Sequence, residues 1–85
     1  MGHFVYLLRC RDNTLYTGYT TDLDRRLKQH QEGKAAKYTR GRRPLFLVGY
    51  LEFSSRGEAL AAEAKVKTMS PNRKLLVITG EEHLS

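Results

Sequence analysis

The pattern of apolar and polar positions along the 85-residue chain predicts strands first and helices later. Residues 4–8 form a short apolar and aromatic run, typical of a buried central strand, and residues 15–20, rich in tyrosine and threonine, predict a second strand. A polar, basic and glycine-containing stretch at residues 34–44 reads as a loop, with one turn of helix around residues 36–38. Residues 45–53 then predict a third strand.

The first helix is expected over residues 22–32, where leucines recur at helical spacing. Thr21 and Asp24 have the spacing of a variant capping box at its start, and Gly33 marks its end. Arg26 and His30 are four residues apart, so they project from the same face of this helix.

Two further helices are expected in the C-terminal part of the chain. Ser55 and Glu58 form a second capping box, and the helix that follows runs to about Met69. A Ser-Pro pair then stops this helix and starts a last one over residues 71–79. The residues expected on the inward side of the longer helix are Ala59, Leu60, Ala64 and Val66.

The turn between the first two strands decides which side chains share a face of the sheet. Residues 11–13 fit a three-residue loop, a type I turn closed by Asn13 in the left-handed conformation. Because side chains alternate between faces, this loop places Tyr6, Tyr16 and the bare backbone of Gly18 on one face, whereas a two-residue loop would separate the two tyrosines. The expected pairs are Cys10 with Thr14, Leu8 with Tyr16, and Tyr6 with Gly18.

These elements predict an α/β (α+β) domain with a small three-stranded antiparallel sheet flanked by helices, in the order strand, strand, helix, strand, helix, helix. Eighty-five residues with 40% hydrophobic content suit one domain, and a chain of this size buries only about 60 to 65% of its unfolded surface. We expect a single domain over residues 1–85, with its core at residues 4–79 and a frayed tail at residues 80–85.

The charge of the chain points to a polyanionic partner. Fifteen lysines and arginines outnumber nine acidic residues, for a formal net charge of +6, so nucleic acid or an anionic membrane surface would attract it. No stretch approaches the roughly 20 apolar residues of a membrane span, and no signal peptide is visible, so a cytoplasmic protein is expected. The basic residues form no amphipathic stripe, which disfavours a membrane-surface adaptor.

One constellation of residues resembles a known family. The spacing of Val5-Tyr6, of Tyr16, Thr17 and Gly18, and of Arg26, His30 and Glu63 is similar to that of the GIY-YIG nuclease superfamily. The resemblance covers residues 4–76 and is greatest with small stand-alone bacterial proteins, which share a KYTRGRRP-like stretch. The late asparagine of the family has no counterpart at Leu75, and Asn72 is only a loose match, so its role is not carried over.

The resemblance implies a metal-dependent endonuclease. Phosphodiester hydrolysis needs an activated water and cationic stabilisation of the phosphoryl oxygens. The family mechanism makes Tyr16 the base, with Tyr6 in the same hydrogen-bonded cluster; Arg26 suits the phosphate because its guanidinium donates two parallel hydrogen bonds. His30 would orient the nucleophile or share a proton with Tyr16. We expect these four residues and Glu63 to converge on one concave surface.

Glu63 is the candidate metal ligand. It lies on the inward edge of an apolar helix face, where a carboxylate needs a compensating charge. A single weakly bound Mg²⁺ or Mn²⁺ ion would supply it, with water and phosphate oxygens as the remaining ligands. The competing explanation of Glu63 is an ion pair with Lys67, four residues on, or burial against Arg26.

The basic loop is the candidate nucleic-acid-binding segment, in which Tyr38 would stack on a base or bond a phosphate. We expect DNA in preference to RNA as the partner, and a monomer or weak dimer. A solvated charged surface is the plainer explanation of the loop, and a non-catalytic nucleic-acid-binding or accessory protein on the same scaffold is the alternative function. The expected nucleic-acid-binding residues are Gly18, Lys37, Tyr38, Arg40, Arg42 and Arg43.

Overall fold

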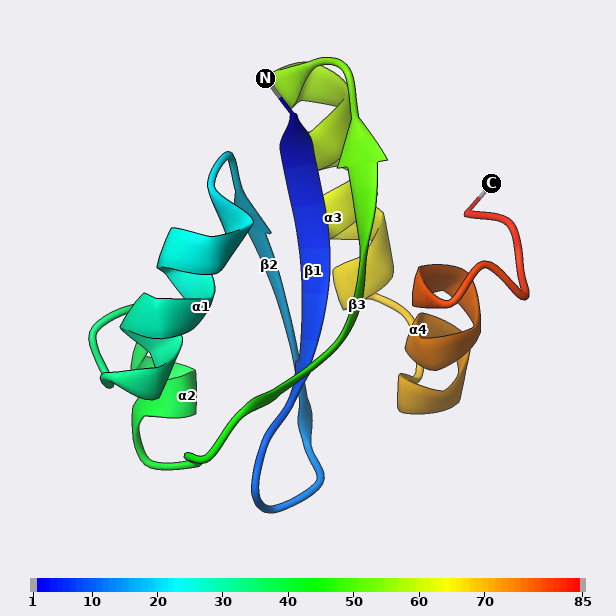
Figure 1. The fold of residues 1–85 in the computed structure, drawn as a ribbon. Coiled ribbons are helices and arrows are strands. Elements are labelled where there is room, and N and C mark those ends of the chain that lie inside the picture. Colours follow the sequence, from blue (N-terminus) through cyan, green and yellow to red (C-terminus); the bar gives the residue numbers. More distant parts are fainter. Residues whose placement is uncertain (1, 85) are drawn as a thin grey trace.

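The computed structural model describes residues 2–84, and their three strands form one antiparallel sheet in the order β2-β1-β3 (Figure 1). The α+β class and the order of elements are therefore confirmed. The strands are β1 (His3–Arg9), β2 (Leu15–Thr20) and β3 (Phe46–Phe53). The helices are α1 (Leu23–Gln31), α2 (Lys37–Arg40), α3 (Arg56–Lys67) and α4 (Pro71–Ile78).

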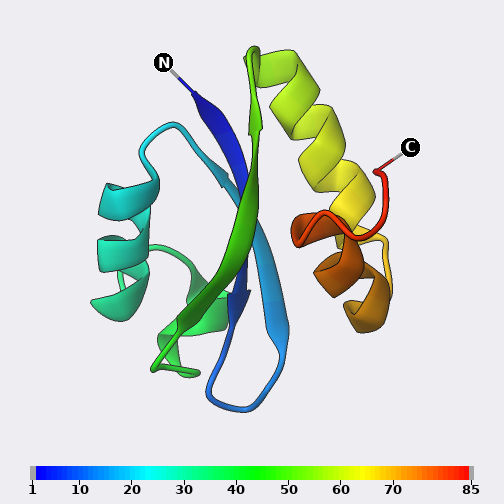
Figure 2. The ribbon, with the colours of Figure 1, turned by 45° about the vertical axis from the view of Figure 1, so that its right-hand side comes forward.

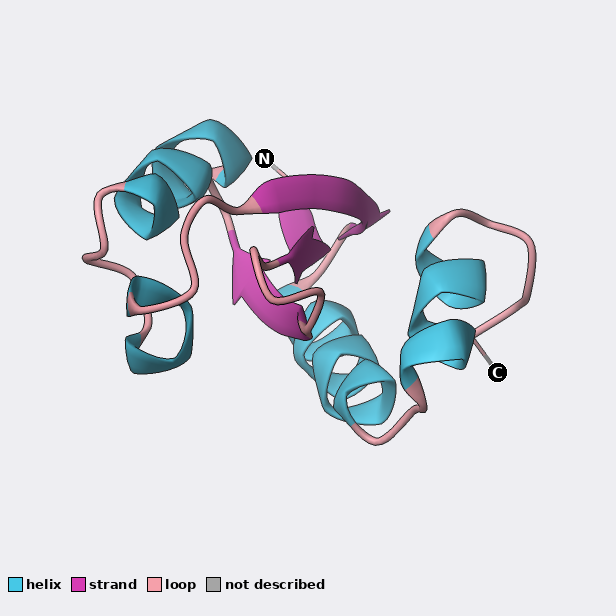
Figure 3. Cartoon of the chain, turned by 90° about the horizontal axis from the view of Figure 1, so that it is seen from below, coloured by secondary structure: helices cyan, strands magenta, loops and turns pink. Residues whose placement is uncertain are grey.

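Helices cover both faces of the sheet, so the domain has three layers (Figure 2). Helices α1 and α2 lie on one side, and α3 and α4 lie on the other; the view from below separates the two groups (Figure 3). Tyr6 and Leu8 of the central strand pack in the cluster that Leu27 of α1 covers, whereas Val5 packs against Ala59 of α3. Successive residues of β1 thus supply two separate clusters, as the alternation of side chains in a strand requires.

The predicted hairpin register is confirmed. The amide of Cys10 donates to the carbonyl of Thr14 over 2.9 Å, and Asn13 has a φ of 66°. The three-residue turn therefore forms with a left-handed asparagine, which tolerates this conformation better than most non-glycine residues. The pairs that follow are Leu8 with Tyr16 and Tyr6 with Gly18.

The predicted cap of the first helix is wrong by one residue. Asp22, and not Thr21, caps α1, because its carboxylate accepts from the amide of Arg25 over 3.1 Å. The hydroxyl of Thr20 accepts from the Asp22 amide over 3.1 Å and so fixes the chain just before the helix. The predicted caps Ser55 and Ser70 of α3 and α4 are confirmed.

The inward face of α3 differs from the prediction at two positions. Ala59, Ala62 and Val66 are buried, a spacing of three and four residues that forms one stripe along the helix. Leu60 and Ala64, expected to face inward, lie off this stripe and are exposed.

The segment after α4, expected to be a frayed tail, contacts the rest of the domain at two positions. The Arg73 Nε atom lies 3.0 Å from a carboxylate oxygen of Glu82, and Leu84 packs against the cluster of Val5 and Ala59. Ser85 lies outside the described residues. Within residues 2–84, no helix is long and apolar enough to cross a membrane.

Candidate active site

A buried chain of hydrogen bonds links the central strand to the two helices above it. The Tyr6 hydroxyl lies 2.7 Å from Nε2 of His30, and Nδ1 of His30 lies 2.9 Å from the hydroxyl of Thr39 on α2. All three side chains are almost fully buried. The Thr39 hydroxyl itself donates to the carbonyl of Ala36 over 3.1 Å.

This series of hydrogen bonds determines the tautomer of His30. The only hydroxyl proton of Thr39 goes to Ala36, so Thr39 can only accept from His30, whose Nδ1 carries the proton. The Nε2 atom of His30 then has a free lone pair and accepts the hydroxyl proton of Tyr6. Tyr6 is consequently a donor within this cluster.

Burial keeps both groups neutral. It lowers the pKa of His30 to about 4, with the nearby charge of Arg26 acting in the same direction. It raises the pKa of Tyr6 to about 12; Arg26 opposes this shift, while Tyr16 and Glu63 add to it. These effects on one hydroxyl indicate that Arg26, Tyr16 and Glu63 all lie within electrostatic reach of Tyr6.

Tyr16 lies at the accessible side of this cluster. Its ring centroid is 5.3 Å from that of His30, with the rings edge to face, and 6.4 Å from the ring centroid of Tyr6. The Tyr38 ring stacks on it at 5.9 Å and 27°. Within residues 2–84, both ring nitrogens of His30 form hydrogen bonds with other residues, so the proton sharing expected between His30 and Tyr16 is not seen.

Gly18 provides the space that Tyr6 occupies. A Cβ atom added at Gly18 would lie 2.3 Å from both the hydroxyl oxygen and Cζ of Tyr6. The phenol cannot move aside readily, because it is buried and bonded to His30. Gly18 is itself buried, which gives it a packing role, and its contact with nucleic acid stays a prediction.

Arg26 offers an unpaired cation beside Tyr6. Its Nη1 atom donates to the side chain of Gln29 over 3.2 Å, its Nε atom is buried with no partner, and it forms none of the ion pairs found within residues 2–84. The guanidinium lines a hollow of about 330 Å³ between residues 19–22 and α1, which Arg25 and Gln29 also line. Two arginines against the single carboxylate of Asp22 make this hollow suited to an anion.

Glu63 comes from the opposite layer. Helix α3 covers the face of the sheet away from α1 (Figure 2), so the five expected residues do not all project from one layer. The Glu63 carboxylate lies 3.4 Å from Nζ of Lys67, with side-chain exposures of 19% and 54%. The alternative ion pair with Lys67 is therefore present, and the metal role stays a prediction.

The basic loop divides into engaged and free side chains. Arg42 donates to Asp12 over 3.1 Å and to the carbonyl of Tyr38 over 2.7 Å. Arg43 donates to the carbonyl of Arg40 over 2.9 Å and to that of Gln31 over 3.2 Å. The side chains of Lys37 and Arg40 are exposed, and no hydrogen bond or ion pair within residues 2–84 uses them.

The sequence patterns did not identify two residues of the site. Thr39 completes the chain to His30, and Asp12 holds Arg42. Polar residues are common in basic loops, and aspartates are common in hairpin turns. Neither residue therefore stands out in the sequence alone.

The fold and the arrangement of the site are those of a nuclease-type family. A family model described as the GIY-YIG catalytic domain matches residues 2–75, so the chain belongs to the GIY-YIG family. It is 54% identical over 74 residues to the UPF0213 protein BH0048 of Halalkalibacterium halodurans, covering 87% of this chain and 79% of that protein. It is also 50% identical over 76 residues to the UPF0213 protein SH2523 of Staphylococcus haemolyticus, covering 89% and 93% of the two chains.

Two solved structures are similar along most of their length. The solution NMR structure of the UPF0213 protein BH0048 from Bacillus halodurans has a TM-score of 0.60 and 48% identity, covering 98% of this chain and 88% of that one. The solution NMR structure of the protein EF2693 from E. faecalis has a TM-score of 0.64 and 37% identity, covering 98% and 91%. The predicted resemblance to the GIY-YIG family, and to its small stand-alone bacterial members, is thereby confirmed.

Proposed function

We propose that this domain is a metal-dependent endonuclease that hydrolyses nucleic acid phosphodiesters. The observation that carries the proposal is the position of Arg26, which forms no ion pair within residues 2–84, lines a hollow and lies close enough to Tyr6 to affect its pKa. Two arginines, Arg25 and Arg26, line this hollow against one carboxylate, Asp22, which favours an anion, and the net charge of +6 favours a polyanionic one.

In this proposal, Arg26 binds the phosphate that is cleaved. Its guanidinium keeps its charge near neutral pH and matches two phosphoryl oxygens at once. The hollow that Arg26 lines would admit the phosphate.

Tyr16 is the proposed base, and Tyr6 is its support. Tyr6 holds its proton, because burial raises its pKa to about 12 and His30 accepts the hydrogen bond. The Tyr16 hydroxyl forms no hydrogen bond to His30. Among residues 2–84 it is not one of the polar side-chain atoms that are buried without a partner, so it can contact a water molecule. His30 orients Tyr6 and packs against the Tyr16 ring.

Glu63 is the proposed metal ligand. Residues 2–84 contain no group of three or more histidine, cysteine or acidic side chains able to hold a metal. The lone, mostly buried carboxylate of Glu63 suits Mg²⁺ or Mn²⁺, which binds through one or two carboxylates with water and phosphate oxygens. A bound ion would neutralise charge on the leaving oxygen.

The test is an assay of the purified protein on labelled single-stranded, duplex and branched DNA and RNA, with Mg²⁺ or Mn²⁺ and with chelator. We expect cleavage that chelator abolishes and that Tyr16→Phe loses. Tyr50→Phe removes the same hydroxyl from an exposed position on β3 and is the matched control. Cleavage that survives in Tyr16→Phe would contradict the role of Tyr16 as the base.

The alternative is a domain that binds nucleic acid without cutting it. Two observations favour this alternative: Lys67 already pairs with the Glu63 carboxylate, and Asn72 is exposed while Leu75 takes the place of the late asparagine. Tight binding without cleavage on every substrate would support this function.

A further inference from the structure

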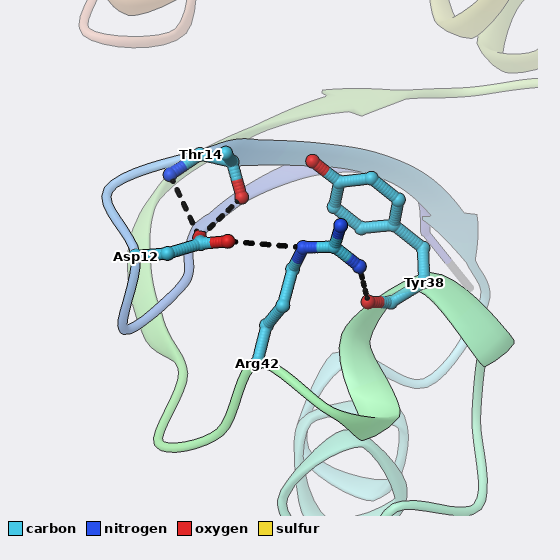
Figure 4. Close-up of polar contacts among 4 residues, drawn as sticks. All are labelled: Asp12, Thr14, Tyr38 and Arg42. Carbon is cyan, nitrogen blue, oxygen red and sulfur yellow. Dashed lines mark hydrogen bonds and ion pairs between the residues drawn. The ribbon is translucent and has the colours of Figure 1, made fainter.

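A network of four residues fastens the hairpin turn to the segment around α2 (Figure 4). One carboxylate oxygen of Asp12 accepts from the Thr14 amide and hydroxyl over 3.1 and 2.6 Å. The other oxygen accepts from Nε of Arg42 over 3.1 Å. The hairpin and the α2 segment also bond through their backbones, since the Arg11 amide donates to the Arg42 carbonyl over 2.9 Å.

Arg42 carries this attachment to Tyr38. Its Nη1 atom donates to the Tyr38 carbonyl over 2.7 Å, and its guanidinium carbon lies 4.0 Å from the centre of the Tyr38 ring. An arginine in this position attracts the ring electrostatically. The backbone and the ring of Tyr38 are therefore both held by one side chain.

Helix α2 needs such attachments. It has four residues and no side-chain cap, and a helix this short is not stable by itself in water. Thr39 fastens it from the interior through His30, whereas Arg42 and Asp12 fasten it at the surface. Between these attachments, Tyr38 stacks on Tyr16.

We propose that Asp12 and Arg42 are positioning residues for Tyr16, and that they act by holding Tyr38 against its ring. This inference rests on the proposed function, in which Tyr16 is the base. It assigns to Arg42 a role different from phosphate binding, because Asp12 and Tyr38 already engage its guanidinium.

The proposal is tested with Asp12→Asn, Arg42→Lys and the double variant. Asparagine keeps an oxygen for Thr14 but removes the charge that holds Arg42. Lysine keeps the positive charge but cannot bond Asp12 and the Tyr38 carbonyl with one planar group. Arg56→Lys, at the exposed start of α3 on the opposite layer, is the matched control.

The first measurement is the NMR chemical shift of the Tyr16 and Tyr38 ring protons in the free protein. We expect both rings to shift in Asp12→Asn and Arg42→Lys and to stay unchanged in Arg56→Lys. The double variant should resemble the single variants, because both changes break the same attachment. Unchanged shifts of Tyr16 would overturn the proposal, whether or not the protein cleaves nucleic acid.

The second measurement is cleavage kinetics. We expect kcat to fall by up to about 100-fold, since misplacing a reacting group by about 1 Å has an effect of that order, while KM stays nearly constant. A loss confined to KM and to the salt dependence of binding would make Arg42 a phosphate contact and overturn the proposal. If the wild-type protein cleaves no substrate but the ring shifts move, the proposed function fails while the attachment of Tyr16 stands.

Discussion

The Tyr6 hydroxyl lies 2.7 Å from Nε2 of His30, in a part of the domain where both side chains are almost fully buried. The bond joins the central strand to α1, and Thr39 extends it to α2. The stability of the domain and the geometry of the proposed site therefore depend on the same hydrogen bonds.

The neutral state of His30 predicts a loss of stability in acid. Its pKa is lowered from the ordinary 6.5 to about 4, so between these values the unfolded chain binds a proton that the folded chain does not. The free energy of unfolding should fall as the pH drops through this window, with a slope of at most about 1.4 kcal/mol per pH unit. Urea denaturation across the window, compared with His30→Gln, measures this component. Equal slopes in the two proteins, or an NMR titration of His30 near its ordinary pKa, would contradict the expectation.

Thr39 should fix the tautomer of His30. Thr39→Val keeps the shape of the buried side chain but leaves Nδ1 of His30 without an acceptor, so the free energy of unfolding should fall by about 1 to 3 kcal/mol. Thr39→Ser keeps the hydroxyl and should restore the ¹⁵N shifts of a ring protonated at Nδ1. The same ring shifts in the valine and serine variants would show that Thr39 does not set the tautomer.

Gly18 should tolerate no side chain. A Cβ atom in Gly18→Ala would lie 2.3 Å from the Tyr6 phenol, and overpacking of this kind costs about 1 to 3 kcal/mol. Gly57→Ala is the control, because an added Cβ meets nothing within 4 Å at that position of α3, and alanine favours a helix by about 1 kcal/mol. Thermal unfolding of both variants should give opposite changes in Tm; an unaltered Tm in Gly18→Ala would refute the packing role.

Glu63 should affect activity far more than stability. Its partner Lys67 is more than half exposed, and a pair of this kind contributes less than about 1 kcal/mol. Glu63→Gln should therefore keep its Tm and its binding of nucleic acid but lose metal-dependent cleavage, because the amide lacks the charge that holds the cation.

Lys67→Gln is the control for the ion pair, since it breaks the pair and leaves the carboxylate in place. It should retain metal-dependent cleavage. A Glu63→Gln protein that still cleaves with metal, or that unfolds at a much lower temperature, would exclude the metal-ligand assignment.

Lys37 and Arg40 should contribute most of the nucleic-acid binding of the loop, because no bond within residues 2–84 engages their side chains. Each change to alanine should weaken binding similarly on all sequences and reduce the slope of log affinity against log salt by about 1. Filter binding or fluorescence anisotropy over a range of salt concentrations measures this slope. An unaltered slope in the double variant would indicate that the loop does not contact phosphates.

The sequence by itself determined the elements and the register of the hairpin. The three-residue turn follows from Asn13, a residue that accepts the left-handed conformation, and it places Tyr6 opposite Gly18 through local geometry alone. The spacing of Arg26 and His30 likewise follows from one helix. These features could be predicted because each depends on residues close together in the chain.

Only the tertiary structure decided the partners of these residues. Thr39 is nine residues from His30, and Asp12 is thirty residues from Arg42, so no local pattern could pair them. Arg42 of the basic loop bonds Asp12 of the hairpin and the Tyr38 carbonyl, and Glu63 approaches Tyr6 from the opposite layer (Figure 2). Contacts between distant segments depend on how the layers pack, and packing involves the whole chain.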